Sequence, residues 1–209
     1  MKIGCAMITM LLANPEGRVY LTDSKLLKEI AYCLEELDAR ARNTGELFFS
    51  KQALEDTMIH GYFTMLGTLS SHKDGLAMLS HHNIFTSLYH ILELRSREDL
   101  IRLIITQLDY THDSHPRIIL SKALTTCDKE IRLFATAHLG KLVDAGGRVA
   151  KWATRLLVTQ LYDPSLDVCR LAVKICTGIC SRVGLLEYLV QLRPMLDHLG
   201  EIGAPLLLG

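Results

Sequence analysis

The sequence contains few aromatic residues and few prolines. Phe, Trp and Tyr make up 6% of its 209 residues, and five prolines are present, whereas hydrophobic residues as a whole make up 49%. The interior must therefore be built mainly from Leu, Ile, Val, Ala and Met, which suits helix packing better than an aromatic-rich sheet. No stretch alternates apolar and polar residues with a period of two, so we predict an all-α fold.

The chain also lacks an excess of charge of either sign. Lys and Arg number 23, and Asp and Glu also number 23, so the formal net charge is zero. A neutral chain has no overall field to attract a phosphate backbone or an acidic membrane surface. We therefore expect no nucleic-acid partner.

The six cysteines form no C-x-x-C pair and no small disulfide framework. Reduced thiols in the cytosol explain them best. Cys169, Cys176 and Cys180 are spaced i, i+7 and i+11, so a helix places them on one side, where they could hold a metal ion. Small, buried apolar residues are the simpler interpretation, because free cysteine is often buried.

The apolar run from Ile3 to Ala13 follows Met1 and Lys2 and resembles a short signal peptide. The match is poor, because only one basic residue precedes the run and Leu11 occupies a position that cleavage requires to be small. Eleven residues are also too few to span a bilayer, so we predict no transmembrane segment. We predict instead a buried helix of a solenoid whose true beginning is missing.

Turn-forming residues interrupt apolar patterns of helical period throughout the chain. One apolar stripe extends from Leu54 to Leu69, and Ser96 with Asp99 forms a candidate capping box for a helix beginning near Arg97. At the carboxyl end, Ala204 to Leu208 is rich in leucine. Because the terminal repeats of a solenoid need polar outer faces, both apolar ends indicate an excised or incomplete piece.

An internal repeat of thirty-seven positions is the most informative pattern. Its first copy contains Leu124, Ile131, Ala135 and Leu142, and the second contains Leu161, Val168, Ala172 and Ile179. Each copy is preceded by another helical segment, and two helices per period are typical of HEAT and armadillo-like helical-repeat solenoids. The alanines allow helices to approach closely. We predict that Arg132 is exposed beside the buried Ile131, and that Arg170 and Lys174 face water.

The common catalytic and nucleotide-binding signatures are absent from the sequence. The cluster from His112 to His115 could serve a metal-dependent enzyme, but adjacent side chains point in different directions and catalytic groups must converge. Ser114 and Pro116 are better explained as the start of a helix. We therefore predict no enzyme, no cofactor, and no catalytic, cofactor-binding or metal-binding residue.

Three other groups of residues have both a functional and a simpler interpretation. His72, His81 and His82 could form a metal group, but solvated turns explain them better. His138 lies at the repeat position of Ile175, so we predict a buried histidine, and Trp152 is expected to pack in the core. Arg148, Lys151 and Arg155 lie at i, i+3 and i+7 on one helix face, where they could contact phosphate or an acidic partner, although a solvated face is the simpler expectation.

Several segments resemble the middle region of the Rictor family, which includes fungal members. The similar segments are Phe48–Lys51, Gly61–Ser70, Leu108–Tyr110, His115–Leu124, Ile131–Ala135, Leu157–Asp163 and Asp197–Gly200. The resemblance implies a subunit of TOR complex 2 that scaffolds the TOR kinase with the other subunits of the complex. It further implies a role in directing that kinase toward AGC-family kinases, with effects on growth and the actin cytoskeleton.

The resemblance also suggests a division of the chain into three parts. Residues 1–95 are similar to the Rictor middle region, residues 96–146 are likened to the non-catalytic N-terminal region of Ras exchange factors, and residues 147–209 form a truncated HEAT-like segment. It implies a cytoplasmic location, with plasma-membrane attachment through complex partners. The alternatives are a helical-repeat adaptor unrelated to TOR, a metal-dependent enzyme using His112 to His115, and a helical repeat that binds RNA.

Overall fold

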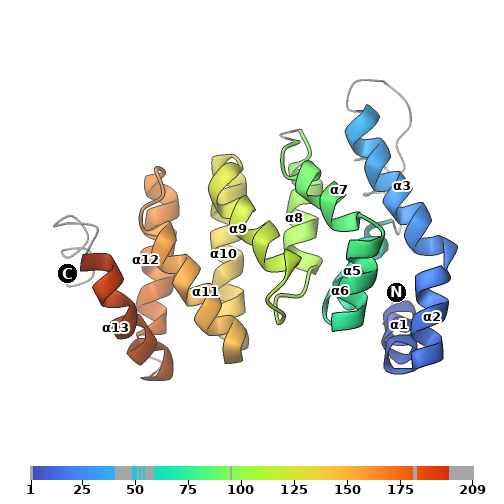
Figure 1. The fold of residues 1–209 in the computed structure, drawn as a ribbon. Helices are drawn as coiled ribbons and strands as arrows, with labels where there is room; N and C mark the ends of the chain where they lie inside the picture. The colour runs from blue at the N-terminus through green and yellow to red at the C-terminus, as the bar shows by residue number, and fades with distance from the viewer. Residues whose placement is uncertain are drawn as a thin grey trace. The chain divides into compact units, whose positions relative to one another are not determined.

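The structure is a computed structural model that describes residues 2–40, 49, 50, 52, 54, 59–94, 96–180 and 183–197. Every regular element in these residues is an α-helix, which confirms the predicted all-α class (Figure 1). The chain divides into two compact units, with the boundary between Ile131 and Arg132. Among the described residues, no helix has the combination of length and apolar character that crossing a membrane requires.

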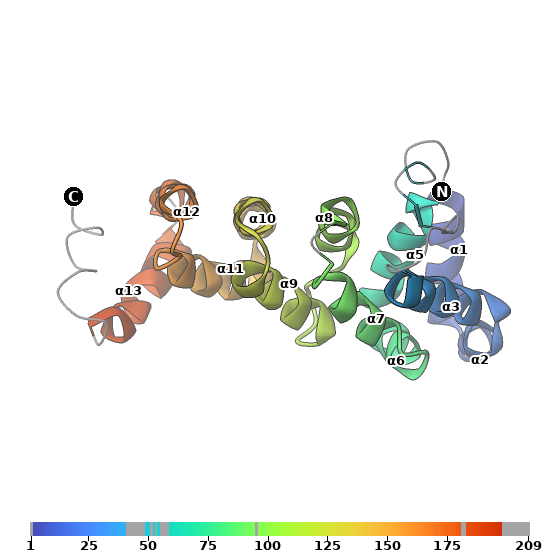
Figure 2. The ribbon, with the colours of Figure 1, turned by 90° about the horizontal axis from the view of Figure 1, so that it is seen from above.

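The first unit contains eight described helices. They are α1 (Lys2–Ala13), α2 (Pro15–Asp23), α3 (Lys25–Arg40), α5 (His60–Ser70), α6 (Lys73–His81), α7 (Ile84–Ile91), α8 (Glu98–Gln107) and α9 (His115–Thr126). Helix α1 packs against α2 and α5, helix α3 packs against α7, and α5 packs against both α6 and α8. Figure 2 shows α3 and α7 side by side in this unit.

Helix α1 buries one face and exposes the other. Ile8 and Leu12 are buried on the side that packs against its neighbours. Ile3, Met7 and Met10 have exposed fractions of 85%, 57% and 75% and lie at i, i+4 and i+7. The prediction of a helix is confirmed for this segment, but the prediction that it is buried is wrong for this second face, which is an uncovered apolar stripe.

Helix α5 approaches α8 very closely at Gly67. A Cβ atom at this position would collide with the backbone carbonyl oxygen of Gln107. Glycine is therefore required here by the distance between two backbones, because the colliding oxygen belongs to main chain that cannot rotate away. The predicted stripe agrees with this packing, since Leu66 and Leu69 are buried, and Phe63 adds a buried aromatic ring.

The start of α8 differs from the predicted capping box. The helix begins at Glu98, the cap residue is Arg97, and no side chain caps the first turn. The Arg97 guanidinium donates to the Asp99 carboxylate at 3.0 and 2.9 Å and to the Phe49 carbonyl oxygen at 2.6 Å. Asp99 thus holds an arginine that anchors a distant backbone segment, and the predicted capping by Ser96 is wrong.

The second unit contains most of α10 (Lys129–Ala145), followed by α11 (Gly147–Gln160), α12 (Leu166–Ile179) and α13 (Val183–Asp197). Helix α11 packs against α12 and α13. In Figure 2, α10 and α12 lie in one layer of this unit, whereas α11 and α13 lie in the other. Gly140 of α10 faces Ile175 of α12, which agrees with these two helices being neighbours within their layer.

The thirty-seven-residue repeat corresponds to two pairs of helices, α9 with α10 and α11 with α12. Ile131, Ala135, Val168 and Ala172 are at most 1% exposed, as predicted for the inner face. Arg170 and Lys174 are exposed, which was also predicted. These pairs are compatible with a HEAT-like array, and the solenoid itself stays a prediction.

A two-glycine turn joins α10 to α11. Gly146 has φ 80° and Gly147 has φ 66°, which is the left-handed half of backbone space. A side chain at either position would strain the backbone. The connection is very short, since α10 ends at Ala145 and α11 begins at Gly147.

Candidate interaction surfaces

The histidine cluster of the first unit does not converge on one point. The ring Nε2 of His112 lies 3.0 Å from the Ser71 carbonyl oxygen, to which it donates. His115 instead stacks on Phe85 with 4.6 Å between ring centroids, and its Nδ1 lies 3.0 Å from the Tyr89 hydroxyl. Ser114 is the cap residue of α9, as predicted, although its side chain makes no capping hydrogen bond. His112 and His115 thus contact different partners, the Ser71 carbonyl and the Phe85 and Tyr89 side chains.

The second histidine group is likewise occupied with local contacts. The rings of His81 and His82 meet edge to face at 5.1 Å, and Nε2 of His82 lies 3.3 Å from the Thr22 carbonyl oxygen. His72 is the cap residue of α6. Across the described part of the chain, no three His, Cys, Asp or Glu residues gather in a way that could hold a metal ion.

Cys169 and Cys176 of α12 and the following cap residue Cys180 also have separate environments. The Cys169 thiol donates to the Asp163 carbonyl oxygen at 3.0 Å, whereas the exposed Cys180 thiol donates to the Cys176 carbonyl oxygen at 3.4 Å. Burial, together with the neighbouring Cys180, raises the pKa of the Cys176 thiol to about 11. Cys176 is therefore a protonated core residue at neutral pH, which agrees with the simpler interpretation. That interpretation is wrong for Cys180, which is exposed, and Cys169 is half-buried.

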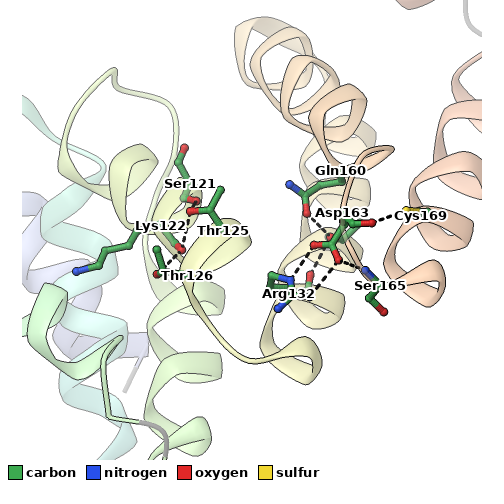
Figure 3. Close-up of polar contacts among 10 residues, drawn as sticks. Ser121, Lys122, Thr125, Thr126, Arg132, Gln160, Asp163, Ser165 and Cys169 are labelled. Atoms are coloured by element: carbon green, nitrogen blue, oxygen red, sulfur yellow. Dashed lines mark hydrogen bonds and ion pairs between the residues drawn. The ribbon is translucent and has the colours of Figure 1, made fainter. Parts of the chain in front are cut away.

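Arg132 and Asp163 form a buried ion pair within the second unit (Figure 3). Nε and a terminal nitrogen of Arg132 donate to the two carboxylate oxygens at 2.7 and 3.0 Å. The Arg132 and Asp163 side chains are 15% and 4% exposed, so the prediction that Arg132 is exposed is wrong. The side chain crosses from the second helix of one predicted repeat to the turn of the next.

The surroundings of Asp163 are arranged to keep its carboxylate charged. Burial raises the pKa of Asp163, but the Arg132 guanidinium and the Ser165 backbone N–H outweigh burial and hold the pKa below its ordinary value. The Ser165 N–H donates at 2.7 Å. Cys169, which occupies the repeat position of Arg132, donates to the carbonyl of the same aspartate. Sequence analysis missed this cluster, because Asp163 lies thirty-one positions from Arg132 and no local pattern joins the two.

His138 is buried on α10, as predicted. Burial, with a smaller contribution from the positive charge of Lys141, lowers the pKa of His138 to about 4. The imidazole is therefore neutral at physiological pH and behaves as a core residue. Trp152 is half-buried, which agrees with a packing role.

The described surface offers two features to a partner. The first is the uncovered apolar stripe of α1. The second is the exposed row Arg148, Lys151 and Arg155 along α11, a helix that contains no acidic residue. We call this row the cationic row of α11.

Family models and whole proteins both match this sequence. A model described as "Rapamycin-insensitive companion of mTOR, middle domain" matches residues 40–143, and one described as "Rapamycin-insensitive companion of mTOR RasGEF_N domain" matches residues 148–209. The "Target of rapamycin complex 2 subunit ste20" of Schizosaccharomyces pombe is 49% identical over 99% of this chain. The chain belongs to the Rictor family.

Other Rictor-family relatives align along the same length. The human "Rapamycin-insensitive companion of mTOR" is 36% identical and the "Target of rapamycin complex 2 subunit TSC11" of Saccharomyces cerevisiae is 29% identical, each over 99% of this chain. The chain spans only 16% of the fission-yeast relative, 12% of the human relative and 16% of the budding-yeast relative.

The matched segments differ from the division expected from the sequence. The model with RasGEF_N in its description matches residues 148–209, whereas the sequence analysis expected that likeness in residues 96–146. The gap between the two family matches, after residue 143 and before residue 148, contains the two-glycine turn. The three-part division itself stays a prediction.

Proposed function

We propose that this Rictor-family chain is a non-catalytic scaffold segment of a TOR complex 2 subunit. In this role it would support assembly of the TOR kinase with its other subunits and signalling to AGC-family kinases. The observation that carries the proposal is the similarity to the fission-yeast complex subunit, which is 49% identical over 99% of the chain.

The local chemistry of the chain is consistent with a scaffold. His112, His115 and His82 each contact a different carbonyl or ring, and their contacts connect helices. Asp163 and Arg132 satisfy each other inside the second unit. The groups that most often perform acid–base chemistry are thus engaged in packing, so the proposal includes no cofactor.

A replacement experiment in fission yeast tests this proposal. The matching segment of the resident complex subunit would be replaced by this chain, and the full-length chimera would be purified from cells. We expect the TOR kinase to co-purify, and an AGC-family kinase to be phosphorylated, at levels near those of the unaltered subunit. A strain in which the same segment is deleted provides the lower reference.

The outcome that contradicts the proposal is a chimera that is expressed normally but retains no more TOR kinase than the deletion strain. Fluorescence microscopy of the same chimera tests the proposed cytoplasmic location with attachment at the plasma membrane. Stoichiometric zinc or iron in the purified chain would contradict its non-catalytic, cofactor-free character.

A further inference from the structure

The arginines of the described chain divide into two groups according to their partners. Six have a carboxylate within ion-pair distance: Arg18, Arg97, Arg102, Arg117, Arg132 and Arg170. Arg148 and Arg155 have none among the described residues, and both are exposed on α11. Lys151 lies between them, with its ammonium group 6.0 Å from the centre of the Tyr188 ring.

These three cations form one continuous face. The spacing i, i+3 and i+7 separates them by about 4.5 and 6 Å along the helix axis. Because α11 contains no acidic residue, no i, i+4 pair within the helix neutralises them. Uncompensated cations so close together repel one another, and a partner with matched negative charges would remove that repulsion.

A shallow depression lies at the amino end of the cationic row. Its volume is about 550 Å³, and its lining includes Val143, Ala150 and Leu185, with Arg148 and Lys151 also on its wall. An apolar side chain fits such a depression, and an apolar anchor flanked by charge pairs is a common arrangement in protein interfaces. The depression and the row together favour a protein segment that carries both kinds of side chain.

We propose that the cationic row of α11 and the adjoining depression bind an acidic helix of a protein partner. Carboxylates at i, i+3 or i+4, and i+7 on that helix would face Arg148, Lys151 and Arg155 at the same time. An extended strand suits the row less well, because its side chains on one face recur about every 7 Å. The proposal does not depend on which complex contains the chain.

Other anionic partners fit this face less well. A membrane-surface helix needs apolar side chains beside its cations, but the apolar residues of α11, such as Ala153 and Leu157, are buried in the unit. Single-stranded nucleic acid is bound by cations interleaved with exposed aromatic rings, whereas Trp152 and Tyr188, which neighbour Lys151, are both half-buried.

Binding of a designed peptide to the full 209-residue chain tests the proposal. The probe is a fluorescein-labelled helical peptide with glutamates at i, i+4 and i+7 and one leucine beside them, and its glutamine counterpart is the negative control. We expect saturable anisotropy with the glutamate peptide that weakens as salt is added. The variant Arg148→Gln/Lys151→Gln/Arg155→Gln should bind about tenfold more weakly, because it loses three exposed ion pairs.

A matched variant separates local recognition from net charge. Lys141→Gln/Arg170→Gln/Lys174→Gln removes the same charge from other exposed positions of the second unit, and we expect its affinity to stay within about twofold of the unaltered chain. The charge-reversed variant Arg148→Glu/Lys151→Glu/Arg155→Glu should instead bind a peptide with lysines in place of the glutamates.

Three outcomes overturn the proposal. The first is no binding of the glutamate peptide, and the second is equal weakening by the two glutamine variants. The third is row-dependent binding to vesicles of phosphatidylserine and phosphatidylcholine in equal parts, or to single-stranded RNA, with none to the peptide. Circular dichroism spectra that overlay for all variants will establish that each one is folded.

Discussion

Within each of the two units, a different kind of polar contact is prominent. In the first unit, charged and aromatic side chains donate to distant backbone carbonyls, as Arg97 does to Phe49 and His112 does to Ser71. In the second unit, a buried ion pair between Arg132 and Asp163 performs the comparable task. The Arg132–Asp163 pair needs an ionised carboxylate that is itself buried, so protonation of Asp163 would remove a contact from the interior of the second unit. The comparison shows that the stability of two similar helical units can depend on charged side chains to different extents.

The largest expected effect tests the close backbone approach in the first unit. Gly67→Ala should lower the free energy of unfolding by about 3 to 4 kcal/mol, because the new Cβ would collide with the Gln107 carbonyl and force α5 from α8. Urea unfolding followed by circular dichroism measures this loss. Gly4→Ala is the control, since open space surrounds Gly4, and it should be neutral or slightly stabilising. Equal effects of the two substitutions would refute the packing argument.

The next effect tests the ion pair of the second unit. Arg132→Met should cost about 3 kcal/mol, because it leaves the Asp163 carboxylate buried without its cation. Arg102→Met is the comparison in the first unit. The pair of Arg102 with Glu98 is 3.5 Å long and about 40% exposed, so its loss should cost less than about 0.5 kcal/mol. Similar losses for both variants would remove the contrast between the units.

Acid should weaken the same ion pair. Because the folded-state pKa of Asp163 lies below its ordinary value of 3.8, the stabilisation is complete above that value and is lost as the pH falls through the folded pKa. We expect Arg132→Met to show a smaller loss of stability than the unaltered chain on titration below pH 3.8.

A further prediction concerns His138 and milder acid. Its pKa falls from an ordinary 6.5 to about 4 on folding, so the unfolded chain binds more protons between these values. The contribution of this group to stability is therefore complete above pH 6.5 and declines toward pH 4, by about 3 kcal/mol. His138→Ile, which places the residue of the second repeat here, should flatten this part of the profile. An unchanged slope would show that the acid sensitivity lies elsewhere.

The smallest expected effect concerns the cationic row. Replacing Arg148, Lys151 and Arg155 together by glutamine should change the free energy of unfolding by less than about 0.5 kcal/mol, since all three side chains are exposed and have no carboxylate partner among the described residues. Thermal unfolding checks this expectation. A large loss would assign the row to folding and remove the basis for a binding role.

Helical period and the thirty-seven-residue repeat predicted most of the fold. They correctly placed Ile131, Ala135, Val168 and Ala172 in the interior. Apolar residues that recur with the helical period form one stripe, and that stripe packs against the core. These patterns failed for Arg132, which hydropathy places in water, because its partner Asp163 is thirty-one positions away. Pairing of two charges across a turn leaves no local pattern, so it becomes visible only in three dimensions.

The cationic row is a second case in which the sequence does not reveal which charges are paired. Sequence spacing placed Arg148, Lys151 and Arg155 on one face. It could not show that six other arginines have carboxylate partners, whereas Arg148 and Arg155 have none within the described part of the chain. The formal net charge of the chain is zero. Only the positions of the side chains distinguish cations that have a carboxylate partner from cations that could bind one on another protein.

The positive φ angles of Gly146 and Gly147 have a consequence for how this surface can vary. The direction in which α11 leaves this turn depends on the backbone conformation of the two glycines. It does not depend on the side chains exposed on the helix. Substitutions on the exposed face of α11 can therefore change which partner it binds without changing the orientation of the helix. A residue other than glycine in the turn would do the reverse, redirecting an unaltered set of cations.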